Sequence, residues 1–163
     1  MKKYFIIFVS LLTFSCNSQP SSKKSNNSLT VKYKVNKSDE QWKSELTSLQ
    51  YYVLRQAGTE RAFSGKYNKN YDEGLYICAA CQVPLYKSNY KYDSRSGWPS
   101  FDRGITENIK YAVDYKLGYK RSELKCSSCG GHLGHLFDDG PKDTTGQRHC
   151  INSAALAFIP KND

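Results

Sequence analysis

Two short stretches of the same form, Cys78-Ala79-Ala80-Cys81 and Cys126-Ser127-Ser128-Cys129, decide how this chain folds. Each is a Cys-x-x-Cys pair followed four residues later by a leucine, at Leu85 and Leu133. Pairs with this spacing are typical of tetrahedral thiolate coordination, which selects zinc or an iron–sulfur cluster. Four cysteines close the coordination shell, so we expect one structural zinc ion that joins two parts of the chain. The alternative is two disulfides, which an oxidising compartment permits.

The sequence around these pairs predicts a small, mainly β domain. The runs 111–115 and 119–124 flank Leu117-Gly118, which indicates a hairpin, and 154–159 is a further strand-forming run. Thirteen tyrosines suit half-buried sheet faces. We therefore expect two antiparallel sheets with short N-terminal helices and a structural zinc site.

The start of this domain has a helix signal. Ser38-Asp39-Glu40-Gln41 combines a serine cap, acidic residues in the first turn and a glutamine three residues after the cap, as in a capping box. We expect one or two short helices packed on the β sheets, with Trp42 in the core. Apolar residues recur at helical spacing as far as Gly58: Trp42, Leu46, Leu49 and Val53.

The N-terminus has the features of an export signal over residues 1–15. Lys2 and Lys3 precede an apolar stretch, Tyr4 to Phe14, that is too short to span a bilayer as a helix. It ends in Leu12-Thr13-Phe14-Ser15-Cys16, which resembles the lipobox of bacterial lipoproteins, in which the cysteine is lipidated. We expect a lipoprotein signal peptide with Cys16 as the lipidation site. The alternative is an ordinary signal peptide or anchor with an incidental cysteine.

A predicted disordered tether, residues 16–36, follows and leads to the domain at 37–163. Its stretch from Asn17 to Ser28 contains no apolar residue and cannot bury enough surface to fold. These features predict a protein of the bacterial cell envelope, exported and lipid-anchored to a membrane. The net charge of +9 includes several lysines in or near the tether, where they suit anionic lipids. Nucleic-acid binding is not expected, because it conflicts with export.

A sixth cysteine, Cys150, has neither a metal-binding nor a processing role. It lies in Arg148-His149-Cys150-Ile151-Asn152-Ser153. A nearby cation lowers the pKa of a thiol, and the thiolate is the nucleophile in cysteine chemistry. In an extended segment Arg148, Cys150 and Asn152 share one face. The alternative is a small buried cysteine in a C-terminal strand.

With these residues in view, the sequence resembles the methionine-R-sulfoxide reductases, the B-type enzymes. The resemblance covers about residues 38–159 and implies a β fold with a structural zinc. It also implies reduction of the R epimer of methionine sulfoxide in proteins. The family's motifs occur in one order: Gly58-Thr59-Glu60-Arg61, Phe63-Ser64-Gly65, the Cys78/Cys81 pair, Tyr92-Asp93-Ser94, Gly97-Trp98-Pro99-Ser100-Phe101, the Cys126/Cys129 pair, His132-Leu133-Gly134-His135, Asp139-Gly140-Pro141 and Arg148-x-Cys150-x-Asn152-Ser153-Ala154.

The resemblance also implies roles for single residues. The Cys150 thiolate attacks the sulfoxide sulfur and becomes a sulfenic acid, which a thioredoxin-like or other thiol reductant then reduces. The helpers are His132 and His135 in the proton-donating network, Asn152 and Arg148 as orienting or polarising groups, and Trp98 as the binding surface for the substrate methyl group. Four of the helpers have an alternative role. Trp98 is then a core residue, His132 and His135 are solvated loop residues or form a second metal site with Cys150, and Arg148 pairs with a surface carboxylate.

The chain departs from the family pattern at three places. Ser96 stands where the family often has a second, resolving cysteine, so regeneration by an external thiol is expected. His149 replaces the usual aromatic residue before the nucleophile, and the loop 141–146 is one residue longer. The rival hypothesis is a zinc-stabilised, non-catalytic module that binds peptide or sulfoxide. Intact Cys150, Trp98 and Asn152 favour the enzyme.

Overall fold

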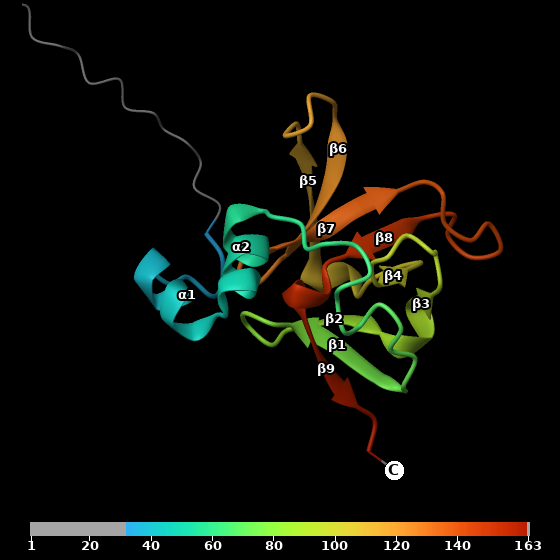
Figure 1. The fold of residues 1–163 in the computed structure, drawn as a ribbon, viewed down its shortest axis with the longest axis horizontal. Helices are drawn as coiled ribbons and strands as arrows, with labels where there is room; N and C mark the ends of the chain where they lie inside the picture. The colour runs from blue at the N-terminus through green and yellow to red at the C-terminus, as the bar shows by residue number, and fades with distance from the viewer. Residues whose placement is uncertain (1–31, 163) are drawn as a thin grey trace, which may run out of the picture. The chain divides into compact units, whose positions relative to one another are not determined.

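The structure of the chain, a computed structural model, describes residues 32–162 (Figure 1). The predicted signal peptide, the predicted lipidation site Cys16 and residues 16–31 of the predicted tether lie outside this range. Within it, no helix combines the length and the apolar character needed to cross a membrane. Next to the first helix, the Val35 N–H donates to the carbonyl of Ser128 at 2.9 Å, in the second Cys-x-x-Cys pair.

Two short helices precede the sheets, as the sequence predicts. Helix α1 spans Asp39–Glu45 and helix α2 spans Ser48–Gln56. The capping box at Ser38 is confirmed, because the Gln41 N–H donates to Ser38 Oγ and the Ser38 N–H donates to Gln41 Oε1. Thr47 and Gln50 form a second box at the start of α2. Trp42 is 2% exposed and belongs to the core.

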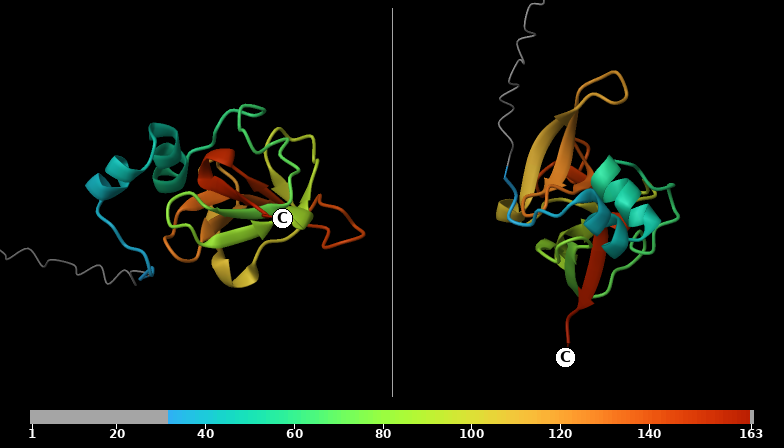
Figure 2. Two further views of the ribbon diagram at one scale, coloured as in Figure 1. Left: turned by 90° about the horizontal axis from the view of Figure 1, so that it is seen from below. Right: turned by 90° about the vertical axis from the view of Figure 1, so that its left-hand side faces the viewer.

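Within residues 32–162, all strand pairings are antiparallel, and they form two sheets, as expected. The three-stranded sheet has the order β2-β1-β9, and the six-stranded sheet has the order β3-β4-β8-β7-β6-β5. The predicted hairpin is β5–β6, and it extends beyond the rest of the domain (Figures 1 and 2). The strands are β1 Gly74–Cys78, β2 Pro84–Lys87, β3 Lys91–Tyr92, β4 Ser100–Phe101, β5 Ile109–Asp114, β6 Arg121–Cys126, β7 His132–Phe137, β8 Arg148–Ile151 and β9 Leu156–Pro160.

An aromatic core joins the two sheets. Tyr86 of β2 stacks on Phe101 of β4 with ring centroids 4.2 Å apart, and Tyr76 of β1 meets Phe101 edge-on at 5.1 Å. All three side chains are fully buried. Because aromatic pairs in these geometries add to the free energy of burial, they fix β4 against the smaller sheet. The strand that pairs with β4 is β8, which carries Cys150.

The register of the larger sheet places five residues in one row across adjacent strands. Tyr92 lies opposite Ser100, Ser100 opposite Cys150, Cys150 opposite His135, and His135 opposite Glu123. Residues directly opposite one another in paired strands share a face of the sheet. The row therefore brings residues far apart in sequence to one face.

A register shift between β6 and β7 adds His132 to that face. Leu124 pairs with Gly134, but the next residue, Lys125, pairs with His132. In a regular strand, residues three apart point to opposite faces. The shift removes this alternation, and the rings of His132 and His135 meet with centroids 5.2 Å apart.

Candidate active site and metal cluster

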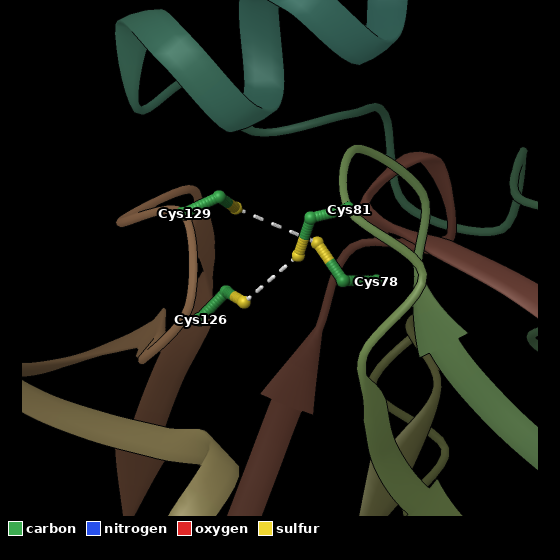
Figure 3. Close-up of side chains that lie close together, drawn as sticks. All are labelled: Cys78, Cys81, Cys126 and Cys129. Atoms are coloured by element: carbon green, nitrogen blue, oxygen red, sulfur yellow. Dashed lines mark hydrogen bonds between the residues drawn. The ribbon is translucent and has the colours of Figure 1, made fainter. Parts of the chain in front are cut away.

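The two Cys-x-x-Cys pairs come together at the ends of two strands. Cys78 ends β1 in the smaller sheet and Cys126 ends β6 in the larger one. The Sγ atoms of Cys78 and Cys129 lie 3.8 Å apart, and those of Cys81 and Cys126 lie 3.5 Å apart (Figure 3). All four cysteines are free thiols, so the structure favours the metal over the disulfide alternative.

The geometry of this cluster suits a metal ion. All four Sγ atoms lie within 4.8 Å of one another. Tetrahedral zinc with Zn–S bonds of about 2.3 Å places its sulfurs about 3.8 Å apart, close to the two distances observed. Gly130 adopts φ +72°, a left-handed conformation that glycine reaches without strain and that lets the second pair turn back on itself. The cluster can hold one metal ion and thereby link the two sheets.

Cys150 lines a separate pocket of about 130 Å³. The pocket also contains three predicted site residues, His135, Trp98 and Asn152. It is completed by residues to which the sequence assigned no role: Thr59, Arg121, Gly134 and Phe137. A larger hollow of about 680 Å³ lies beside Glu73 and Lys161, but no cysteine or histidine lines it. Its lining offers neither a thiol nor an imidazole, so the smaller pocket, which has both, is the candidate active site.

Hydroxyl groups approach the thiol from one side of the row. Ser96 Oγ lies 3.9 Å from Cys150 Sγ, and Ser94 Oγ lies 2.8 Å from Ser96 Oγ and 2.6 Å from Ser100 Oγ. Burial raises the pKa of the Cys150 thiol, while the Arg148 charge and the Ser96 hydroxyl act in the opposite direction. These two groups therefore favour the thiolate in a partly buried place.

Arg148 does not line the pocket. Its guanidinium donates two hydrogen bonds to the Asp139 carboxylate, at 2.8 and 2.9 Å, and its Cζ lies 4.3 Å from the centre of the Phe137 ring. The arginine is thus held beside the pocket by a bidentate pair. From there it affects the thiol through its charge.

The two predicted histidines differ in position. His135 lines the pocket, and its Nε2 lies 2.8 Å from Asp114 Oδ2. His132 is 2% exposed and does not line the pocket, and its Nδ1 lies 2.7 Å from Glu123 Oε1. A carboxylate only accepts hydrogen bonds, so Nε2 of His135 carries a hydrogen and Nδ1 is the other nitrogen of the ring. Burial lowers the pKa of His135, and Asp114 opposes this shift.

A buried carboxylate, Glu60, organises the opposite wall of the pocket. Its backbone N–H donates to Asn152 Oδ1 at 2.9 Å, and its carbonyl accepts from Trp98 Nε1 at 3.2 Å. Its side chain accepts from the N–H groups of Ser153 at 2.6 Å and Ala154 at 2.9 Å. One residue therefore positions the tryptophan and the asparagine relative to the strand that carries Cys150.

His149, the departure from the usual aromatic residue, lies on the other side of the sheet. It is 1% exposed, and its Nδ1 lies 3.3 Å from the Tyr86 hydroxyl. Its ring meets the Tyr86 ring edge-on at 5.8 Å. The alternation predicted for β8 is confirmed, with His149 in the core and Cys150 facing the pocket.

Sequence reasoning assigned no role to Glu60, Asp114, Glu123 or Ser94. Glu60 and Ser94 lie within motifs of the family, but nothing in a motif says which of its residues are buried. The sequence gives only a weak indication for Asp114 and Glu123. They lie in the two strands of the predicted hairpin, where two carboxylates can share one face of the sheet. The pairing of β5 with β6 and of β6 with β7 determines which histidine each carboxylate contacts.

Fold and site together define a class of protein: a small β protein with a four-thiol cluster and, separately, a thiol in a pocket beside a carboxylate-bound histidine. This arrangement is that of an enzyme with a nucleophilic cysteine. Comparison with known proteins defines the group further. The SelR domain family matches residues 46–160.

Similar proteins carry the same type of name. The peptide methionine sulfoxide reductase MsrB of Leptospira interrogans is 54% identical over 129 residues, which is 78% of this chain and 98% of that protein. The MsrB of Methanosarcina mazei is 50% identical over 131 residues, 80% of this chain and 93% of that protein. The mitochondrial methionine-R-sulfoxide reductase B3 of Mus musculus is 50% identical over 128 residues, 78% of this chain and 50% of that protein. The chain belongs to the SelR domain family, the B-type methionine sulfoxide reductases.

The position of Glu60 leads to a prediction about stability. Glu60→Gln removes one of the two carboxylate oxygens that accept from the Ser153 and Ala154 N–H groups. A buried donor without a partner costs about 1–3 kcal/mol, so the free energy of unfolding should fall by that amount. Urea unfolding measures it, with Glu73→Gln as control, because Glu73 forms an exposed pair with Lys161. An equal effect of both substitutions would contradict the role assigned to Glu60.

Proposed function

We propose that the pocket of Cys150 is where this chain carries out the chemistry of its family. The chain is a peptide-methionine (R)-S-oxide reductase, and it reduces the R epimer of methionine sulfoxide in proteins to methionine. The observation that carries the proposal for the site is the convergence of the Cys150 thiol, His135 and Trp98 on one small pocket. These groups are a nucleophile, an imidazole that can take up and pass on a proton, and an apolar wall.

The reaction begins with the thiolate. The sulfoxide sulfur is electrophilic, but its oxygen is a poor leaving group unless it is protonated. The Cys150 thiolate attacks the sulfur, and a protonated group in the pocket delivers a proton to the oxygen. The products are methionine and the Cys150 sulfenic acid, so the cysteine sulfur is oxidised by two electrons and the methionine sulfur is reduced by two.

We assign the proton transfer to His135. It lines the pocket, and Asp114 binds its Nε2, which leaves Nδ1 as the nitrogen that exchanges a proton with the substrate. His132 packs behind it and is bound to Glu123, so we assign it a positioning role. Trp98 forms the wall for the substrate methyl group. Asn152 lines the pocket beside Cys150, and the charge of Arg148 favours the thiolate.

Regeneration of the thiol requires a partner. In the described residues, the thiols other than Cys150 belong to the four-cysteine cluster. The nearest equivalent of a resolving cysteine is Ser96, whose hydroxyl cannot form a disulfide. We therefore propose that an external thiol, from a thioredoxin-like or other reductant, reduces the sulfenic acid directly.

We propose that the cluster holds one zinc ion, with Cys78, Cys81, Cys126 and Cys129 as ligands. Four soft thiolates at tetrahedral spacing suit zinc, and a closed shell leaves no position for substrate. Zinc would supply a link between the sheets and no step of the reaction.

We also propose that the protein is exported and anchored in the bacterial cell envelope through a lipid on Cys16. The support is the sequence alone: a basic start, a short apolar stretch and a lipobox-like ending.

Cys150→Ser tests the function. The variant should lose all reduction of methionine R-sulfoxide while it keeps its fold and its metal, because the thiol is the nucleophile and no cluster ligand is changed. Chiral analysis of racemic methionine sulfoxide after incubation with dithiothreitol measures the activity. Turnover by the variant would reject the assignment. Binding without turnover by the parent chain would favour the non-catalytic module instead.

Cys126→Ser tests the cluster. Metal binding to a small site of this kind is worth on the order of 10 kcal/mol of folding free energy, and loss of one thiolate removes much of it. The variant should contain less than one zinc per chain and melt at a lower temperature. Cys150→Ser is the matched control and should keep full zinc. Unchanged metal content and melting in Cys126→Ser would show that this cysteine is not a ligand.

Ser96 leads to a prediction about the intermediate. One equivalent of substrate should leave a persistent Cys150 sulfenic acid that dimedone traps, and mass spectrometry detects it. Ser96→Cys should instead form a disulfide, because the two side-chain atoms are only 3.9 Å apart. Ser122→Cys, an exposed position in β6, is the control and should leave the sulfenic acid in place. Release of metal during the first turnover would show that a cluster cysteine resolves the intermediate.

The anchor is tested on the mature protein. It should carry a lipid on Cys16 and enter the detergent phase on partition, because the acyl chains are apolar. Intact-mass measurement identifies the modified residue. A water-soluble form with unmodified Cys16 would refute the lipoprotein assignment.

A further inference from the structure

Three exposed aromatic rings border the Cys150 pocket, and they come from three different segments. Phe137, at the end of β7, lines the pocket and is 37% exposed. Tyr119, in the β5–β6 turn, is 58% exposed, and the guanidinium of the pocket residue Arg121 lies 6.0 Å from its ring centre. Phe63 is 68% exposed and packs over Gly97, next to Trp98. We call these three residues the aromatic rim.

Folding does not explain the position of Phe63. Its φ is +64°, a conformation that a bulky side chain adopts only at a cost. The Phe63 N–H donates to the Gly97 carbonyl at 2.7 Å, which holds the segment in place. The exposed ring gains little from burial in return. A strained backbone that presents an apolar ring beside a pocket points to binding.

Two arginines next to the pocket have carboxylate partners. Arg121 pairs with Asp114, and Arg148 pairs with Asp139. A surface of aromatic rings with paired arginines is typical of the centre of a protein interface.

The Cys150 pocket is too small to enclose more than the end of one substrate side chain, so the rest of a protein substrate lies on the rim. Sites that enclose a whole small ligand typically have volumes of about 300–1,000 Å³. The Cys150 pocket, at about 130 Å³, is much smaller and takes the sulfoxide end of one side chain. The main chain of a protein substrate and the residues on either side of the oxidised methionine must therefore lie outside, across the rim.

We propose that the aromatic rim binds apolar residues that flank methionine sulfoxide in an extended segment of an oxidised protein. Oxidation makes a buried methionine polar and disrupts the core around it, so its apolar neighbours lose their burial as well. Such a segment offers apolar side chains on both sides of the sulfoxide. The inference rests on the proposed function of the Cys150 pocket.

The first experiment compares substrates on the full chain. Three peptides of equal length carry a central methionine R-sulfoxide flanked by leucine, serine or glutamate, and N-acetyl-methionine R-sulfoxide serves as the compound that fills the pocket alone. The leucine peptide should have a kcat/KM about tenfold above that of the serine peptide, because its flanking side chains lose water on the rim. Equal values for these two peptides, or a preference for the glutamate peptide, would overturn the proposal.

The second experiment tests the rim itself. Tyr119→Ser should lower the ratio of kcat/KM for the leucine peptide to that for N-acetyl-methionine R-sulfoxide by about fivefold, as expected for an interface aromatic residue. Phe63→Asn should do the same without backbone strain, because asparagine tolerates a positive φ. Val113→Ser is the control: Val113 is 52% exposed on the opposite face of the same hairpin, and the ratio should not change. An unchanged ratio in both rim variants would overturn the proposal.

Single-turnover measurements on the reduced enzyme, without any reductant, identify the occupant. The rim variants should be slower with the leucine peptide under these conditions, because only substrate is bound. A defect that appears only in multiple turnover with thioredoxin would show that the rim binds the reductant and would overturn the proposal. Dissociation of a dimer in the rim variants, seen by sedimentation, would overturn it in favour of a second copy of the chain. Failure of the parent chain to reduce any of the three peptides or N-acetyl-methionine R-sulfoxide would instead refute the proposed function.

Discussion

The antiparallel pairing of β8 between β4 and β7 is the constraint on which the site depends. It sets Cys150 opposite Ser100 on one side and opposite His135 on the other. A slip of one residue would turn Cys150 into the core and His149 toward the substrate. Gly134 permits this register, because a Cβ at its position would lie 1.9 Å from the carbonyl oxygen of Cys150. Close approach of the two strands thus requires a glycine in the His132–His135 motif.

Local signals predicted the elements of the fold well. The capping box at Ser38, the β5–β6 hairpin and the two cysteine pairs all appear in the structure, because each depends on residues near one another in sequence. The helical spacing groups Leu49 with the buried residues Trp42 and Val53, yet the side chain of Leu49 is 49% exposed. The chain leaves helical geometry at Leu46 and starts again after Thr47, so the apolar stripe of the second helix follows a new phase and buries Val53 and Leu54.

The candidate site was predicted only in part, and the reason lies in its long-range contacts. Glu60 and Asn152 are 92 residues apart in the chain, yet one hydrogen bond joins them. The separate environments of His132 and His135 follow from a register shift between two strands, which a periodic pattern does not reveal. The residues proposed to perform the chemistry were found from their type and motif. The residues that hold them in place could be identified only once the pairing of the strands was known.

The buried His149 has a consequence for how the protein responds to acid. Burial lowers its pKa to about 4, from about 6.5 for an exposed histidine. As the pH falls from about 6.5 toward 4, the unfolded chain binds a proton at this residue that the folded chain does not bind, so acid shifts the equilibrium toward unfolding. In this pH range, acid therefore destabilises the fold around Cys150 through His149, a buried residue on the opposite face of the same strand.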